Sequence, residues 1–114
     1  MFTGANAGWW FLISAGIAEI CYAAAIPRTE GFTRPWPTLY CVVFIALSLY
    51  LLAMAVRTLP VGTAYAVWVG IGAVGTAVYG ILFLGEAASA ARIACLLLIV
   101  AGVAGLKLFS PAMA

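Results

Sequence analysis

The chain has 114 residues, of which 68% are hydrophobic and 7% are charged, and it contains no histidine. Soluble domains are roughly half apolar and a quarter charged, so this composition excludes an ordinary soluble domain and favours an integral membrane protein surrounded by lipid. The net charge of +2 is too small and scattered for a nucleic-acid partner. We expect a single membrane domain over residues 1–114, because about four spans of about 20 residues each leave room only for short loops.

Four apolar runs follow one another along the chain. They cover about residues 8–26, 38–56, 61–84 and 93–109. The polar segments between them carry Pro27, the Leu59-Pro60 step and Gly85-Glu86, which are typical helix breakers and turn formers. No run alternates as a membrane strand would, and only helices and closed barrels satisfy backbone polar groups in lipid. We therefore predict an all-α integral membrane protein with four transmembrane helices per chain.

The basic residues are almost balanced between the two sides of the membrane. An even number of spans places both termini on one side, together with Arg57 and Lys107. Arg28, Arg34 and Arg92 then lie on the opposite side. Orientation follows the difference in basic residues between sides, which is very small here. The sequence therefore favours insertion in both orientations, as an antiparallel dimer of one gene product requires. The alternative is that a weaker signal fixes one orientation.

Glu19 is the charged residue that interrupts the first apolar run, close to its middle. An acidic side chain at mid-membrane is costly by roughly 2.5 kcal/mol or more, so it requires a functional or a pairing explanation. Removal from water favours the protonated acid, and a group in that state can exchange its proton for a cation. We interpret Glu19 as a proton- and cation-binding group. The alternative is a protonated structural glutamate that bonds to a neighbouring helix.

Aromatic residues occur at helical spacing near this acid and in the third run. Tyr22 follows Glu19 by three residues and so shares its helix face, and Tyr65 and Trp68 share a face of the third helix. Electron-rich rings beside a carboxylate suit a bound cation. The alternative is ordinary helix packing or anchoring at the membrane interface.

Glycine and alanine suggest where helices approach closely or bend. Gly70 and Gly72 can provide either a hinge in the third helix or simple packing contacts. Ala101, Gly102 and Gly105 give the fourth helix a surface of small residues that can pack closely against another helix in a dimer. A four-helix chain with one membrane acid resembles half of a site, so we expect two copies to form the functional unit.

Several segments of the sequence are similar to those of a known family. They are Ala18-Glu19, Glu30-Gly31-Phe32-Thr33-Arg34 with Trp36-Pro37, Leu59-Pro60-Val61-Gly62-Thr63-Ala64-Tyr65-Ala66-Val67-Trp68, and Ala101-Gly102-Val103. With them, the chain resembles the small multidrug resistance family over residues 9–109. Two further segments, Val69-Gly70-Ile71-Gly72-Ala73-Val74-Gly75 and Gly85-Glu86, resemble the guanidinium-exporter branch of that family.

This resemblance implies a transporter and not an enzyme, with no metal and no cofactor. It implies an antiparallel, dual-topology homodimer in the bacterial inner membrane that exchanges protons for a cytoplasmic guanidinium-type cation. Glu19 would bind proton and substrate in turn, and Ser48 would hydrogen-bond and orient it. Tyr65 and Trp68 would line the cavity. Gly70 and Gly72 would let the third helix bend between states.

The chain departs from the guanidinium-exporter branch at two positions. That branch usually has tryptophan at the position of Tyr22 and lysine at the position of Pro27. The leading expectation is export of guanidinium or small substituted guanidinyl cations, and these two differences are compatible with a larger guanidinyl compound or a broader range of cations. The alternatives are a multidrug exporter of quaternary ammonium ions, one subunit of a heterodimeric pair, and an accessory membrane subunit.

Overall fold

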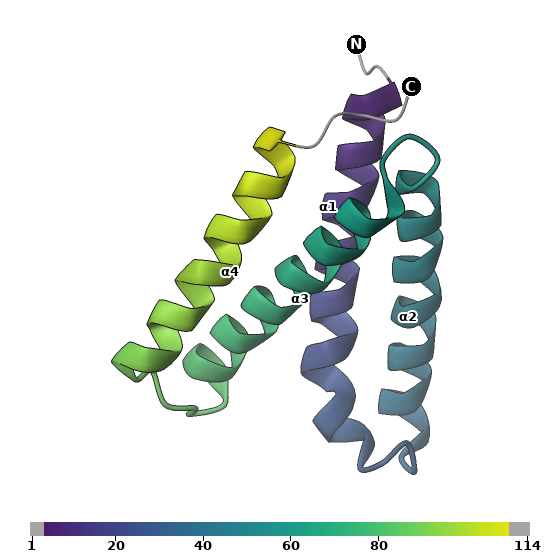
Figure 1. The fold of residues 1–114 in the computed structure, drawn as a ribbon. Coiled ribbons are helices and arrows are strands. Elements are labelled where there is room, and N and C mark those ends of the chain that lie inside the picture. Colours follow the sequence, from purple (N-terminus) through teal and green to yellow (C-terminus); the bar gives the residue numbers. More distant parts are fainter. Residues whose placement is uncertain (1–3, 110–114) are drawn as a thin grey trace.

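The computed structural model describes residues 4–109, and side chains from Ala7 onward. The helices are α1 (Gly4–Ala25), the 3-10 helix η1 (Ile26–Thr29), α2 (Pro35–Ala55), α3 (Val61–Phe83) and α4 (Ala90–Phe109) (Figure 1). Each predicted apolar run corresponds to one α-helix, and all 4 are long and apolar enough to cross a membrane. The predicted all-helical class with four spans is confirmed for the described residues. Residues 1–3 and 110–114 of the predicted domain lie outside them.

Two helices begin three residues before the predicted starts at 38 and 93. α2 begins at Pro35, because proline is well suited to the first helical position, where its missing N–H is not needed. α4 begins at Ala90, since alanine is the strongest helix former. The hydroxyl of Ser89 accepts a hydrogen bond from the backbone N–H of Arg92 over 3.2 Å, which caps the new helix. The stretch of alanine and serine over residues 87–91 (the Ala/Ser stretch) is thus partly helix rather than only a turn.

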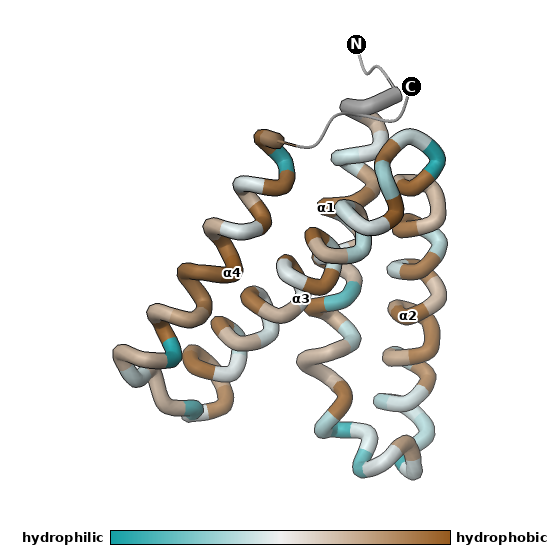
Figure 2. The backbone as a smooth tube through the Cα atoms, viewed as in Figure 1, coloured by the Kyte–Doolittle hydropathy of each residue, from teal (hydrophilic) through white to brown (hydrophobic). Residues whose placement is uncertain are grey.

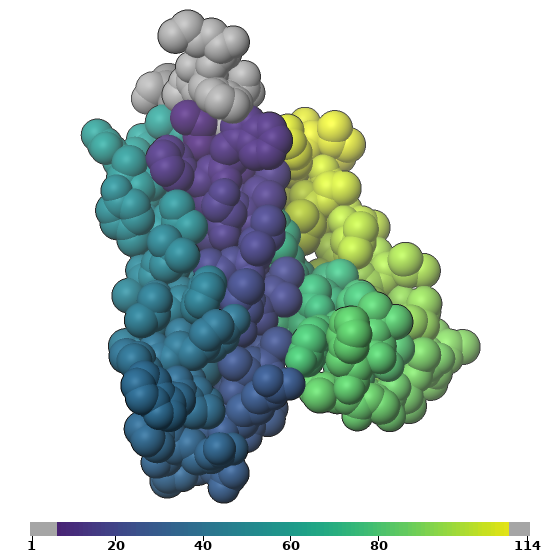
Figure 3. Space-filling model, turned by 180° about the vertical axis from the view of Figure 1, so that it is seen from behind, coloured from purple at the N-terminus to yellow at the C-terminus, as the bar shows by residue number. Residues whose placement is uncertain are grey.

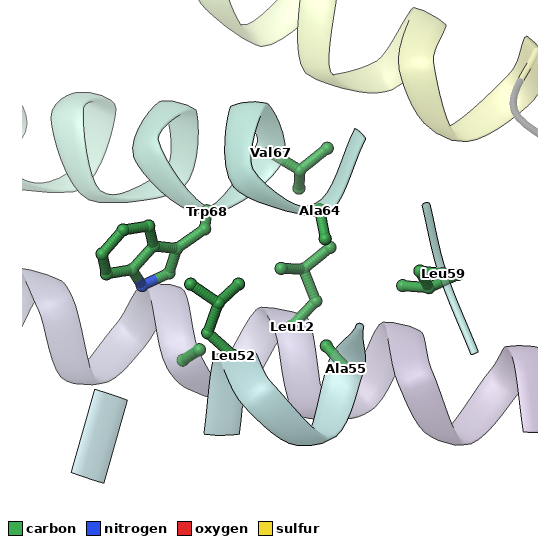
Figure 4. Close-up of a cluster of buried hydrophobic side chains, with 8 residues drawn as sticks. Leu12, Leu52, Ala55, Leu59, Ala64, Val67 and Trp68 are labelled. Carbon is green, nitrogen blue, oxygen red and sulfur yellow. The ribbon is translucent and has the colours of Figure 1, made fainter. Parts of the chain in front are cut away.

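The first two helices run side by side in opposite directions, and α3 crosses α1 obliquely (Figure 1). The side chains at the meeting point of α1, α2 and α3 form the buried core (Figure 4). Its members are Leu12, Ala15, Leu52, Ala55, Leu59, Ala64, Val67 and Trp68. This core fixes the three helices that carry the predicted site residues.

Glycines permit the close crossing of α1 and α3. Ile71 of α3 occupies the space where a Cβ atom of Gly16 would be, and Ile20 of α1 does the same at Gly75. Large side chains thus insert over small residues in both directions, which is a common way for membrane helices to gain packing contacts.

The fourth helix packs along α3 and exposes most of its surface. None of its residues is buried, and its exposed face is strongly hydrophobic (Figure 2). From behind, α3 and α4 form one side of the molecule and α1 and α2 the other (Figure 3). The ammonium group of Lys107 lies 5.0 Å from the centre of the Trp9 ring and so links the ends of α4 and α1. An apolar face of this kind is stable in lipid or against another helix.

Candidate functional site

Glu19 lies on α1 with its side chain directly against α3. A Cβ atom at Gly72 would collide with the Glu19 carboxyl group, so glycine is required there for this approach. The Oε1 atom of Glu19 is buried and has no hydrogen-bond partner among the residues that the structure describes. In the part of the chain that the structure describes, the ion pairs join Arg34 to Glu30 and Arg92 to Glu86, and neither includes Glu19. A buried carboxyl oxygen without a partner is satisfied by a proton or by a bound cation.

Ser48 is completely buried and connects three helices. Its hydroxyl donates to the carbonyl oxygen of Ala15 on α1 over 2.7 Å, and it accepts a hydrogen bond from Trp68 Nε1 on α3 over 3.0 Å. Because a hydroxyl has one proton, it cannot also donate to Glu19 in this arrangement. The hydrogen bond from Ser48 to Glu19 that the family resemblance implies is therefore not formed here. Instead, Ser48 fixes the indole of Trp68.

The aromatic residues predicted for the site belong to α1 and α3. The rings of Tyr65 and Trp68 meet edge to face, with their centres 5.3 Å apart and their planes at 63°. Tyr65 remains 55% exposed, whereas Trp68 is only 6% exposed. Tyr22 follows Glu19 by three residues on α1 and so lies on the same face of that helix. The structure thus brings Trp68 into contact with Tyr65 and with Ser48, while the placement of these rings around Glu19 stays a prediction.

The two candidate hinge glycines contact different neighbours. Gly70 lies against Val103 of α4, and Gly72 lies against Glu19. α3 is a continuous α-helix from Val61 to Phe83. Both glycines therefore serve close packing in this structure, and the hinge stays a prediction.

The small residues predicted to pack in a dimer lie on a helix face that is open within the chain. Ala101 and Gly102 are exposed, and Gly105 is half-buried. A Cβ atom added at Gly102 or Gly105 would meet nothing within 4 Å. Nothing in the described part of this chain covers these two glycines.

A cavity of about 460 Å³ extends from Glu19 along α3 to the loop before α4. Thr76 and Tyr79 line its α3 side, and Glu86 and Arg92 line its end at the loop. None of these four residues was predicted to belong to the site. Thr76 could have been found, because it follows Gly72 by four residues and so lies on the same face of the helix.

Four apolar helices and a buried carboxyl oxygen without a partner in the described part of the chain define a small multi-pass membrane protein suited to binding a proton or a cation. Comparison with known proteins identifies the family. The family model described as "Small Multidrug Resistance protein" matches residues 7–99, so the chain belongs to this family of transporters. It is a multi-pass protein of the bacterial inner membrane.

Relatives from several bacteria match nearly the whole chain. A protein of Yersinia pestis named "Guanidinium exporter" is 53% identical over 102 residues, which are 90% of this chain and 98% of the relative. Proteins of the same name from Citrobacter freundii and Salmonella typhimurium are each 54% identical over 100 residues, which are 88% of this chain and 95% of each relative. The predicted resemblance to the guanidinium-exporter branch of the family is confirmed.

Proposed function

We propose that the protein is a proton-coupled antiporter that exports guanidinium or small substituted guanidinyl cations from the cytoplasm. The observation that carries the proposal is the buried Oε1 atom of Glu19, which has no partner in the described part of the chain. A membrane acid in this state binds a proton or a cation and is unstable with neither. The relatives named "Guanidinium exporter" support the identity of the cation.

Competition for Glu19 couples the two fluxes. A proton neutralises the carboxylate and removes its attraction for the substrate, whereas a bound guanidinium ion excludes the proton. The planar guanidinium group donates two parallel hydrogen bonds to a carboxylate, which makes the pair geometrically specific. The rings of Tyr22, Tyr65 and Trp68 add faces that attract a cation.

The functional unit that we propose is an antiparallel homodimer of this single membrane domain. Each copy contributes one Glu19, and the two acids share one cavity. The exposed small residues of α4, Ala101 and Gly102, support the dimer because they permit close approach of another helix. The nearly equal numbers of basic residues on the two sides support insertion in both orientations. Bending of α3 at Gly70 and Gly72 then alternates access between the two sides.

Purified protein in liposomes tests the function directly. Under a pH gradient, guanidinium should drive proton movement that is recorded as a current on a capacitive sensor. Glu19→Gln should abolish the current, because the amide neither titrates nor attracts a cation. Glu30→Gln, which removes an exposed loop carboxylate, is the matched control and should retain the current. Currents that persist in Glu19→Gln would contradict the mechanism.

The same experiment separates the alternatives. If bulky quaternary ammonium ions give currents and guanidinium gives none, the protein is a multidrug exporter of the other branch. Tags at both termini report the orientation of the chain in cells. A single orientation would contradict the antiparallel homodimer and favour a heterodimer with a second chain.

A further inference from the structure

The cavity beside α3 contains two carboxyl groups, not one. Glu19 lies against Gly72, and Glu86 lies against Gly80 in the same close way. The two glycines are eight residues apart, which corresponds to about 12 Å along the helix axis. Thr76 lies midway between them, and its hydroxyl oxygen is buried without a hydrogen-bond partner in the described part of the chain. Polar groups therefore follow α3 from mid-membrane to the loop before α4.

The turn at the end of α3 holds Glu86 in place. Gly85 adopts a left-handed conformation with a φ of 71°, which glycine adopts without strain. The backbone N–H groups of Leu84 and Glu86 both donate to the carbonyl oxygen of Gly80, over 3.0 and 3.1 Å. The chain thus folds back, and the Glu86 side chain lies over the last turn of the helix. The negative end of the α3 dipole and the carboxylate act together there and favour a cation.

The cation that occupies this position is a guanidinium group of the protein itself. Nη2 of Arg92 lies 2.6 Å from Glu86 Oε1, and Nη1 donates to the carbonyl oxygen of Ala87 over 3.0 Å. Both side chains of this ion pair line the cavity. The other loop ion pair, between Arg34 and Glu30, is longer at 3.7 Å, and its side chains are 58% and 67% exposed. Neither Arg34 nor Glu30 lines this cavity, so the ion pair of Glu86 and Arg92 differs from the other loop ion pair in its access to the Glu19 cavity.

We propose that Glu86 is a docking site for the guanidinium substrate at the loop end of the cavity, and that Arg92 of the same chain competes with the substrate for the Glu86 carboxylate. The proposal rests on the function proposed above and assigns a second substrate contact. A guanidinium ion presents the same planar donors as Arg92 and exchanges with it on the carboxylate. The ion then moves along α3 past the Thr76 hydroxyl to Glu19. Arg92 returns to Glu86 behind it, so that the carboxylate is neutralised when no substrate is present.

Single substitutions of the two partners distinguish docking from a structural ion pair. In proteoliposomes, Glu86→Gln should lower kcat/KM for guanidinium about fivefold, because the docking charge is lost. Arg92→Gln should raise kcat/KM for guanidinium, since it removes the group that competes for Glu86. Glu30→Gln and Arg34→Gln are matched controls from the other loop and should stay within about twofold of the unsubstituted protein. A structural ion pair predicts instead that Glu86→Gln and Arg92→Gln have the same effect, because either one breaks the same contact.

A binding measurement separates this inference from the transport function. The side-chain NMR resonance of Arg92 is followed in the Glu19→Gln protein while guanidinium chloride replaces sodium chloride at constant ionic strength. Displacement of Arg92 from Glu86 should shift the resonance. In the double variant with Glu19→Gln and Glu86→Gln, guanidinium should no longer shift it. A shift in the Glu19→Gln protein, together with an absence of guanidinium currents in the unsubstituted protein, would retain the docking site and refute the proposed function. An unchanged resonance, or equal losses of kcat/KM in Glu86→Gln and Arg92→Gln, would overturn the docking site.

Discussion

Replacement of Ser48 by alanine tests the polar contact at the centre of the helix core. The substitution removes the hydroxyl that joins α2 to Ala15 of α1 and to Trp68 of α3. The indole N–H of Trp68 then loses its acceptor, and water cannot easily replace it because Trp68 is only 6% exposed. The other helix contacts of Ser48 change little, since alanine differs from serine by a single oxygen atom.

The expected loss of stability follows from these two contacts. Interhelical hydrogen bonds in membrane proteins contribute about 0.6 kcal/mol on average and up to about 1.7 kcal/mol. An unsatisfied buried donor costs about 1–3 kcal/mol. We therefore expect Ser48→Ala to lower the free energy of unfolding by about 1–3 kcal/mol. Guanidinium binding should weaken as well, because Trp68 is no longer held against Tyr65.

Unfolding in mixed micelles with increasing dodecyl sulfate, followed by far-UV circular dichroism, measures this loss. Ser14→Ala is the matched control, because Ser14 is an exposed serine of α1, and it should change the stability by less than about 0.5 kcal/mol. A double-mutant cycle with Trp68→Phe should give a coupling energy of about 0.6–1.7 kcal/mol. A coupling near zero, or equal effects of Ser48→Ala and Ser14→Ala, would refute this account of Ser48.

Other substitutions and conditions test the remaining features. Gly72→Ala should destabilise the protein and abolish guanidinium currents because its Cβ collides with Glu19, whereas Gly62→Ala, which meets nothing within 4 Å, should be tolerated in both assays. The double substitution of Gly102→Leu and Gly105→Leu should reduce dimerisation, measured by chemical crosslinking in liposomes, while each chain keeps its helix content. An unchanged fraction of dimer would place the interface elsewhere. The apparent Kd for guanidinium should rise as the pH is lowered, by at most about tenfold per pH unit for each proton displaced, and a flat titration would exclude competition at Glu19.

Most of the fold could be predicted from the sequence because lipid imposes a simple rule on the backbone. Apolar runs of spanning length gave all four helices, and the position of Glu19 within its run gave the membrane acid. The starts of α2 and α4 were less predictable, since proline and the Ala/Ser stretch are compatible with both loop and helix. Helix ends depend on local capping, such as the Ser89 hydroxyl at α4, which a hydropathy pattern does not contain.

The environment of the site was harder to predict because it depends on how helices meet. Spacing along one helix related Tyr22 to Glu19, and Tyr65 to Trp68, but it could not choose a hydrogen-bond partner for Ser48. That choice follows from the crossing of three helices, which brings Ser48 to Ala15 and Trp68. Likewise, Glu86 reaches the cavity only because the chain reverses at Gly85 and folds over Gly80.

The arrangement of glycines in α3 connects the proposed bending of this helix to the two carboxylates. Glu19 belongs to α1 and lies against Gly72, whereas Glu86 belongs to the loop that follows α3 and lies against Gly80. A bend near Gly70 and Gly72 would therefore move Glu86 while Glu19 remained with α1. The spacing of the acids would change with the state of the transporter, so that substrate passes between them in one state only. Spin labels on η1 and on the last turn of α3 should then report two distances whose populations shift when guanidinium is added. A single distance that guanidinium does not alter would exclude this coupling.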